Sequence, residues 1–188
     1  MSKKLKLVEL GDRILRTKAK AVAPQEILTK EFQKFARDLI KMCDESEGVG
    51  IASPQVGVAK RVFILWSRMT KKRKNVRAPR VPDLGPLTIV NPKIVQTSKS
   101  LVKGWEGCLS IPGIRGLVPR YKSIDVEFTN EKGEKIKMKF SDFPARIFQH
   151  EFDHLNGVVF LDRTDPKDLV TEREYKKINQ KSKFRNQK

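Results

Sequence analysis

The sequence predicts an α+β fold, in which mixed, mostly antiparallel sheets pack around a central helix that carries the letters HEFDH. Segments with strand-like composition occupy the middle of the 188-residue chain. One helical pattern precedes them and a second follows them, an order that favours α+β over a wound parallel sheet. The length is typical of a single domain. We expect this domain to span residues 1–188, with its core at about 8–163 and a basic C-terminal extension at 164–188.

The early part of the chain predicts a helix followed by separate strands. A helix is expected over about residues 25–45, where apolar side chains recur at helical spacing. Strands are expected near residues 61–66, 88–90 and 104–109 from their apolar and β-branched composition. The periodic apolar positions of the helix are Leu28, Phe32, Phe35, Leu39, Met42 and Cys43.

A hairpin and a second helix follow these strands. Residues 123–129 and 135–140 alternate in polarity, and the Asn-Glu-Lys-Gly segment between them predicts a turn. In the helix after the hairpin, Ser141 or Asp142 can cap the N-terminus, Pro144 is tolerated in the first turn, and Gly157 can end the helix. A last short strand is expected at residues 158–161.

The second helix carries the clearest functional signal. His150 and His154 are the only histidines of the chain, and Glu151 directly follows the first. Residues four apart lie on one helix face, so both imidazoles can bind one ion while Glu151 leans toward a bound water. Two core histidines beside an unrelated glutamate are the simpler alternative. Asp153 can orient a ligand or form a salt bridge, and we expect the salt bridge.

A catalytic metal site usually takes three protein ligands, so a third one is needed. The metzincin pattern is excluded because Phe160 holds the position of its third histidine. Glu172 or Glu174 could complete a thermolysin-like site, although both lie in a charge-rich stretch. Cys108, at the end of a strand-like segment, is the better candidate. Cys43 follows the apolar periodicity of the first helix and is expected to be a core residue.

Three segments together resemble the motifs of the peptide deformylase family. They are residues 48–55 (GVGIASPQ), 106–110 (EGCLS) and 149–154 (QHEFDH). The resemblance extends from about residue 8 to residue 163. Two departures are visible: Ser53 stands where the family usually has a second alanine, and Arg13 stands where proline is common. Neither replaces a ligand or a catalytic group, so both bear on substrate fit more than on chemistry.

The resemblance implies a hydrolase that removes the N-formyl group from the formyl-methionine of newly synthesised polypeptides and releases formate. One divalent ion per chain would be held by Cys108, His150 and His154. Iron(II) is the family's typical ion, and zinc, nickel and cobalt are alternatives that the same ligands suit. A metal-bound water is the implied nucleophile, and Glu151 is the implied general acid and base.

The resemblance also implies the groups that contact the substrate. The side-chain amide of Gln55 and the backbone N–H of Leu109 would stabilise the oxyanion. The glycines of the first motif would pair with the peptide backbone, and three apolar residues would line the methionine pocket. An ordinary turn and plain core packing are the alternatives for these residues. The implied substrate-binding residues are Gly48, Val49, Gly50, Arg115, Phe143 and Ile147.

The charge of the chain, +18, is high and unevenly distributed. Residues 68–80 and the segment from residue 176 onward contain basic residues without acidic ones. Such blocks are commonly solvated surface, but they can also bind polyphosphate. By resemblance to family members with a ribosome-binding extension, the basic tail is expected to contact the ribosome. No apolar run is long enough to cross a membrane.

The beginning of the sequence, Met-Ser-Lys-Lys, does not resemble a signal or transit segment. We therefore expect a bacterial cytoplasmic protein with reduced cysteines and no disulfide. Two other classes remain open at this point. One is a cytosolic metallopeptidase that uses Glu172 or Glu174 as its third ligand. The other is a basic nucleic-acid-binding protein with a structural metal, although closed structural sites usually have four ligands.

Overall fold

The computed structural model describes residues 5–67 and 85–185 and confirms the α+β class. It contains a five-stranded sheet of order β1-β2-β3-β6-β7 and a three-stranded sheet of order β4-β5-β8, both paired antiparallel throughout. The first sheet consists of β1 (Gly50–Ala52), β2 (Val62–Trp66), β3 (Pro86–Thr97), β6 (Ser123–Thr129) and β7 (Lys135–Ser141). The second consists of β4 (Leu101–Cys108), β5 (Ile111–Tyr121) and β8 (Leu169–Thr171).

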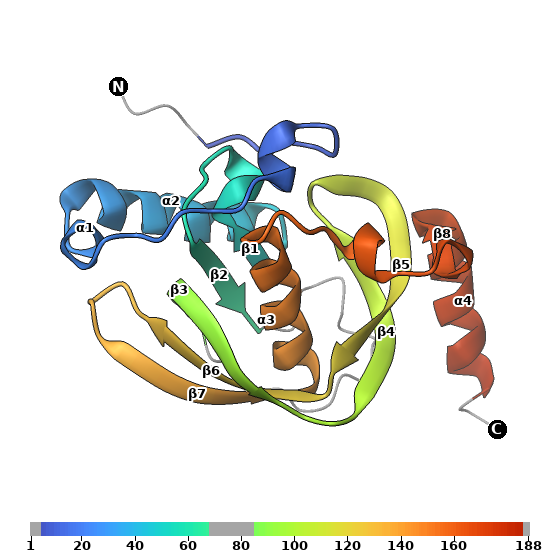
Figure 1. Ribbon diagram of the computed structural model, residues 1–188. Coiled ribbons are helices and arrows are strands. Elements are labelled where there is room, and N and C mark those ends of the chain that lie inside the picture. The colour runs from blue at the N-terminus through green and yellow to red at the C-terminus, as the bar shows by residue number, and fades with distance from the viewer. Residues whose placement is uncertain (1–4, 68–84, 186–188) are drawn as a thin grey trace.

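Helices cover these sheets and separate them. Helix α3 runs through the middle of the molecule, α2 lies along β1 and β2, and α4 lies beside β5 and β8 (Figure 1). The central position of α3 explains why most of its residues are buried. The helices are α1 (Pro24–Ile27), α2 (Lys30–Glu45), α3 (Asp142–His154) and α4 (Glu172–Arg185).

Strand β2 lies between two helices and is buried on both faces. Phe63 and Leu65 belong to the core cluster that includes α3, whereas Val62 and Ile64 belong to the cluster that includes α2. Successive side chains of a strand point to opposite faces, so a strand covered on both sides must be apolar at every position. The unbroken run VFIL is therefore a consequence of where this strand lies.

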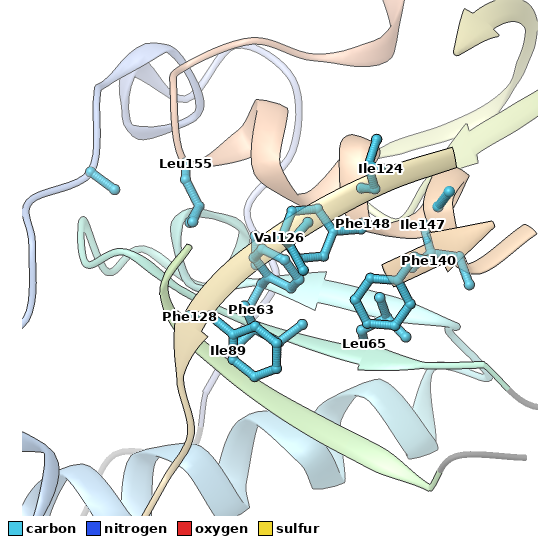
Figure 2. Packing of buried hydrophobic residues seen from close by; sticks show 13 residues of the cluster. Phe63, Leu65, Ile89, Ile124, Val126, Phe128, Phe140, Ile147, Phe148 and Leu155 are labelled. Atoms are coloured by element: carbon cyan, nitrogen blue, oxygen red, sulfur yellow. The ribbon is translucent and has the colours of Figure 1, made fainter. Parts of the chain in front are cut away.

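The apolar face of α3 packs on the first sheet. Phe148 is fully buried, and its ring lies 5.1 Å from that of Phe63 and 5.6 Å from that of Phe140, centroid to centroid. Figure 2 shows Phe148 among side chains of β2, β3, β6 and β7. Residues two apart on a helix point in nearly opposite directions, so this packing turns His150 away from the first sheet. It therefore directs His150 toward β4.

Several predicted elements are confirmed. Strands occur at 62–66 and 101–108, the hairpin joins β6 to β7, and α3 contains both histidines. Cys43 is fully buried in the core cluster of α2, as expected. The two cysteines are both free. No helix among the described residues is long and apolar enough to cross a membrane. The basic block at residues 68–80 lies outside the described residues.

The expected helix at residues 25–45 is interrupted. It divides into α1 and α2 because Thr29 caps the second helix, its hydroxyl accepting a hydrogen bond from the Phe32 N–H. An N-cap residue has extended backbone angles, so the helix cannot continue through it. Leu28 lies at this break and is 65% exposed, so its expected place in the apolar stripe is wrong.

The expected strand at residues 158–161 is also wrong. Residues Phe160–Arg163 form a short 3-10 helix, and the Asp162 carboxylate accepts a hydrogen bond from the Val159 N–H at its start. Val159 and Phe160 are buried in a small cluster against the second sheet, which accounts for the apolar letters that resemble a strand. Strand β3 is longer than expected, and β1, β5 and β8 were not predicted.

Replacing Phe148 with alanine should lower the free energy of unfolding by about 3–5 kcal/mol, because the cavity left beside the rings of Phe63 and Phe140 cannot collapse fully. Urea denaturation of the variant and the parent protein measures this difference. Val95→Ala is the matched control, since Val95 is 55% exposed on β3 and its loss should change stability by less than about 0.5 kcal/mol. Equal losses for both variants would contradict this packing.

Candidate metal centre

The structure brings the three predicted ligands together. Cys108 ends β4, whereas His150 and His154 lie one turn apart on α3. One ligand atom from each residue lies within 4.8 Å of the others. The Cys108 Sγ is 3.3 Å from the His154 Nε2, and the two imidazole rings are 5.0 Å apart between centroids. A strand end and one helix face therefore hold three metal-binding groups around one point.

A buried carboxylate orients the first histidine. The Nδ1 of His150 lies 2.9 Å from the Glu106 Oε2. Because an ionised carboxylate only accepts hydrogen bonds, Nδ1 donates and Nε2 remains for a metal ion. Burial alone would lower the pKa of His150, but its hydrogen bonds to Cys108 and Glu106 hold that pKa well above its ordinary value.

Glu106 is itself held by two arginines. Arg120 donates from Nε and from one terminal nitrogen at 2.9 and 3.0 Å, and Arg146 donates from NH1 at 2.8 Å. Burial would raise the pKa of Glu106, but the hydrogen bonds from His150 and Arg120 hold it well below its ordinary value. Glu106 is therefore ionised at neutral pH. We did not single out Glu106, Arg120 or Arg146 from the sequence.

The sequence indicates only weakly that Glu106, Arg120 and Arg146 lie together. Glu106 stands two residues before Cys108 in the second motif, and alternate residues of a strand point to the same face. That rule directs Glu106 toward the ligands. Nothing in the order of residues indicates that Arg120 from β5 and Arg146 from α3 meet it there.

Asp153 forms the expected salt bridge. Its carboxylate accepts hydrogen bonds from Arg120 at 2.5 Å and from Arg163 at 2.8 Å. Because Arg120 also binds Glu106, the carboxylates of β4 and α3 share one guanidinium. This arrangement joins the second sheet to the helix that carries both histidines.

Gln55 is oriented toward the cysteine. The amide oxygen of its side chain accepts a hydrogen bond from the Ala52 N–H at 2.8 Å. Its amide nitrogen lies 3.3 Å from the Cys108 Sγ and 3.4 Å from the Ser110 Oγ. Fixing the oxygen on the backbone leaves the nitrogen as the atom that faces the metal centre. Leu109 follows Cys108 at the turn between β4 and β5.

Glu151 is buried beside the ligands and carries an unsatisfied oxygen. Among the described residues, its Oε2 has no hydrogen-bond partner. A Cβ added to Gly50 would lie 2.4 Å from the Glu151 Oε1, so only glycine leaves room for this carboxylate. Burial raises the pKa of Glu151 to about 7. The group can therefore accept and release a proton near neutral pH.

These residues fit a single divalent ion. A thiolate and two imidazole nitrogens are ligands that zinc, iron, cobalt and nickel accept. Three protein ligands leave a coordination position open, as in catalytic sites. The alternative ligands lie elsewhere: Glu172 pairs with Arg115, and Glu174 pairs with Lys177. Neither belongs to the ligand group found in the described part of the chain.

Most of the implied substrate-binding residues lie on α3 and at the start of β1. Val49 and Phe143 are partly buried and pack against the core cluster of α3. Ile147 is 4% exposed and belongs to that cluster, so core packing accounts for much of its surface. Gly48 donates its N–H to the Cys43 carbonyl at the end of α2. Gly50 begins β1, the terminal strand of the first sheet.

Comparisons with known proteins agree with this geometry. The family model of polypeptide deformylase matches residues 4–170. Peptide deformylase 2 of Nostoc sp. strain PCC 7120 is 47% identical over 93% of this chain and 94% of that protein. A Met-Ala-Ser-bound class I type b peptide deformylase from Acinetobacter baumannii has a TM-score of 0.79 at 39% identity and covers 87% of this chain and 99% of its own. The enzyme from Thermotoga maritima has a TM-score of 0.75 at 33% identity, with coverage of 88% and 100%.

Replacing Glu106 with glutamine should weaken metal binding by about 10- to 100-fold, because the amide no longer fixes the proton of His150 on Nδ1. Competition with a chromogenic chelator measures the dissociation constant. Glu127→Gln is the control, since Glu127 lies on β6, which carries no ligand, and forms an exposed ion pair with Lys137. Unchanged metal affinity in the Glu106 variant would show that this carboxylate has no part in orienting His150.

The buried Glu151 should make the metal-free protein lose stability as the pH rises. Its carboxyl is neutral in both states below about 4.5, but it must ionise against burial as the pH passes about 7. The contribution to the free energy of unfolding should fall by about 3 kcal/mol across this interval. Denaturant titrations of the metal-free protein and of Glu151→Gln between pH 4.5 and pH 8 measure the difference between them. Parallel pH profiles would mean that Glu151 is ionised throughout.

Proposed function

The chain belongs to the peptide deformylase family, and we propose that its substrates are the N-formyl-methionyl ends of newly synthesised polypeptides. Its activity is that of a peptide deformylase, a hydrolase. The observation that carries the proposal is the cluster of Cys108, His150 and His154, with Gln55 and Glu151 directed at it. The bound Met-Ala-Ser of the Acinetobacter baumannii enzyme supports a methionyl peptide as the ligand.

We propose iron(II) as the resident ion, with zinc, nickel or cobalt as substitutes. The residues that would hold it are Cys108, His150 and His154, because their donor atoms converge and Glu106 leaves the His150 Nε2 available. When bound, such an ion would supply Lewis acidity, which lowers the pKa of a bound water. Metal analysis of protein purified without oxygen tests the assignment, and a protein that holds zinc alone would contradict it.

Glu151 is the proposed general acid and base. Its unsatisfied Oε2 can accept a proton from the attacking water and deliver it to the amine nitrogen that leaves with the peptide. A pKa of about 7 suits both transfers, since an acid that holds its proton too tightly or too weakly is a poor relay. The lack of a side chain at Gly50 leaves the space that this carboxylate occupies.

Gln55 and Leu109 are the proposed donors to the formyl oxygen. Negative charge grows on that oxygen as water adds to the formyl carbon, and donors fixed in advance stabilise it. The Gln55 amide nitrogen is fixed because its oxygen is bonded to the Ala52 N–H. Leu109 directly follows Cys108, the last residue of β4, so its N–H belongs to the peptide group that joins it to the ligand residue.

The peptide is proposed to lie along the outer edge of β1. In the described part of the chain β1 pairs with β2 alone, so a peptide can add along its other edge, beginning at residues 48–50. Val49, Phe143 and Ile147 would line the pocket for the methionine side chain. Arg115 would contact the residues that follow methionine.

We also propose that the protein works in the bacterial cytoplasm and contacts the ribosome through its basic extension. Bacterial relatives support the setting. The extension includes α4, on which Lys176 and Lys177 are exposed. Lysines bind the phosphates of RNA by releasing counterions, so this contact should weaken steeply with salt. Residues 1–188 would form one domain that carries both the catalytic centre and the docking helix.

Formate release from formyl-Met-Ala-Ser by the iron(II)-loaded protein tests the function. Release should be rapid in the parent and should fall by a factor of 100 or more in Glu151→Ala, since general acid–base catalysis supplies about 100- to 10,000-fold. Cys108→Ser should lose both metal and activity. A protein that holds one metal ion per chain and yet releases no formate would refute the proposed substrate.

Replacing Gln55 with leucine should lower turnover by roughly 100-fold or more without loss of metal, because one donor to an oxyanion contributes about 3–4 kcal/mol. Single-turnover formate release and metal analysis of the same sample separate the two effects. Ser98→Ala serves as control, since its hydroxyl hydrogen-bonds to Ser100 in the loop between β3 and β4 and to the start of β6. Unchanged turnover in Gln55→Leu would remove this amide from the mechanism.

Neutralising the lysines of the extension should weaken co-sedimentation with ribosomes and flatten its dependence on salt, while formate release from a short peptide stays intact. The docking variant changes to glutamine the residues Lys176, Lys177, Lys181 and Lys183. A control with the same loss of charge changes the exposed Lys132, Lys135, Lys137 and Lys139 of the β6–β7 hairpin. Equal binding by the parent and the docking variant would exclude the extension as the contact.

A further inference from the structure

Arg115 on β5 is clamped by the first two turns of α4. Its Nε donates to the Glu172 Oε2 at 2.5 Å, and its guanidinium carbon lies 5.2 Å from the centroid of the Tyr175 ring. The Tyr175 ring packs in turn on Trp105 of β4, with 5.5 Å between centroids. Residues three apart share a helix face, so Glu172 and Tyr175 act on the same guanidinium.

The pairing of β8 with β5 determines where this clamp forms. Val170 of β8 lies opposite Arg115, and α4 begins directly after this strand. The pairing of β8 with β5 therefore places the first turn of α4 beside the Arg115 side chain. The contact does not depend on the distant part of the helix.

The clamp holds the guanidinium against the strand that ends in the metal ligand. A Cβ added to Gly107 would lie 2.4 Å from the Arg115 NH1. Gly107 directly precedes Cys108, and adjacent Cα atoms are only about 3.8 Å apart. The Arg115 guanidinium therefore packs over Gly107, the residue that precedes the proposed metal ligand Cys108. The lack of a side chain at Gly107 leaves space for it.

Part of the Arg115 guanidinium remains available to bind a ligand. Its Nε is used by Glu172, but within the described residues its two terminal nitrogens donate to no partner. Its side chain is 30% exposed. A guanidinium offers five N–H groups in a fixed plane, which suits carbonyl and carboxylate oxygens. The clamp thus presents a rigid pair of donors at the border of the site.

We propose that Glu172 and Tyr175 are positioning residues for substrate recognition: they hold Arg115 so that its terminal nitrogens donate to a backbone carbonyl of the residues that follow formyl-methionine. The inference rests on the proposed function. A free arginine side chain would lose its rotational freedom on binding the peptide, and a clamped one has already lost it. The clamp therefore acts on affinity. It leaves the chemistry at Cys108 unchanged, since this contact is the same in the ground state and the transition state.

The test compares a long and a short substrate. Formyl-Met-Ala-Ser reaches beyond methionine, whereas formyl-methionine amide does not. In Glu172→Gln and in Tyr175→Ala, KM for the long substrate should rise about three- to tenfold with kcat unchanged, which is the effect of freeing one long side chain. KM for the short substrate should stay at the parent value. Tyr175→Phe, which keeps the ring, should restore the parent KM for the long substrate.

Glu174→Gln is the matched control. Glu174 lies on the same helix and pairs with Lys177, and the change removes the same charge. Its KM for both substrates should equal that of the parent. A rise in KM for Glu174→Gln equal to that for Glu172→Gln would overturn the proposal, because the effect would then come from the net charge of α4.

Other outcomes would also overturn the inference. An unchanged KM for the long substrate, with a lower melting temperature, would mean that the clamp only docks α4 on the sheet. An equal fall in kcat for both substrates would place its effect on the metal centre. If the parent releases formate from neither substrate, the proposed function fails and this inference fails with it. Normal release by the parent with no change in the variants defeats the inference alone.

Discussion

The buried carboxylate of Glu106 is the constraint on which the rest of the structure depends. It lies between the second sheet and α3, and it accepts hydrogen bonds from His150, Arg120 and Arg146. An ionised carboxylate that is only 4% exposed would be strongly destabilising without such partners. Because Arg120 lies on β5 whereas Arg146 and His150 lie on α3, Glu106 has all three partners only when β4, β5 and α3 assemble together. The same bond that satisfies Glu106 fixes the proton of His150, so the fold and the metal site share one interaction.

The spacing of residues along single elements was enough to predict the ligands, whereas contacts between elements were not. His150 and His154 could be placed on one helix face from their separation alone. Cys108 was the better third candidate from its strand-like segment, and the motif resemblance agrees with that choice. Arg120 and Arg146 could not be identified because neither belongs to a motif, and an arginine outside a motif looks like any other surface charge. Strand β5 was missed because its letters, IPGIRGLVPRY, contain prolines and glycines that usually end strands. Tertiary packing provides the pairing that this local sequence does not favour.

The glycines of β1 and β5 are a second example of contacts between elements that the sequence alone does not predict. From the sequence, residues 48–50 could be an ordinary turn or a close approach to another group, and the letters do not decide between them. In the structure, Gly50 leaves the space that the Glu151 carboxylate fills, and Gly116 leaves space for the Phe160 ring. Both glycines lie in strands with buried neighbours, where a side chain would force a partner to move. Their role is to let two elements approach closely, and only the position of the partner element reveals it.

The C-terminal helix brings the proposed clamp on Arg115 next to the start of the basic segment that is proposed to contact the ribosome. Its first two turns hold Arg115 through Glu172 and Tyr175, and the exposed Lys176 and Lys177 follow at once. With a rise of 1.5 Å per residue, these lysines start within about 8 Å of the clamp, which is close to the screening length at physiological salt. A polyanionic partner on the lysines would therefore act on the same helix turn that positions Arg115. Such a partner would have to leave the start of α4 in place, because pulling it from β5 would release the guanidinium beside Cys108.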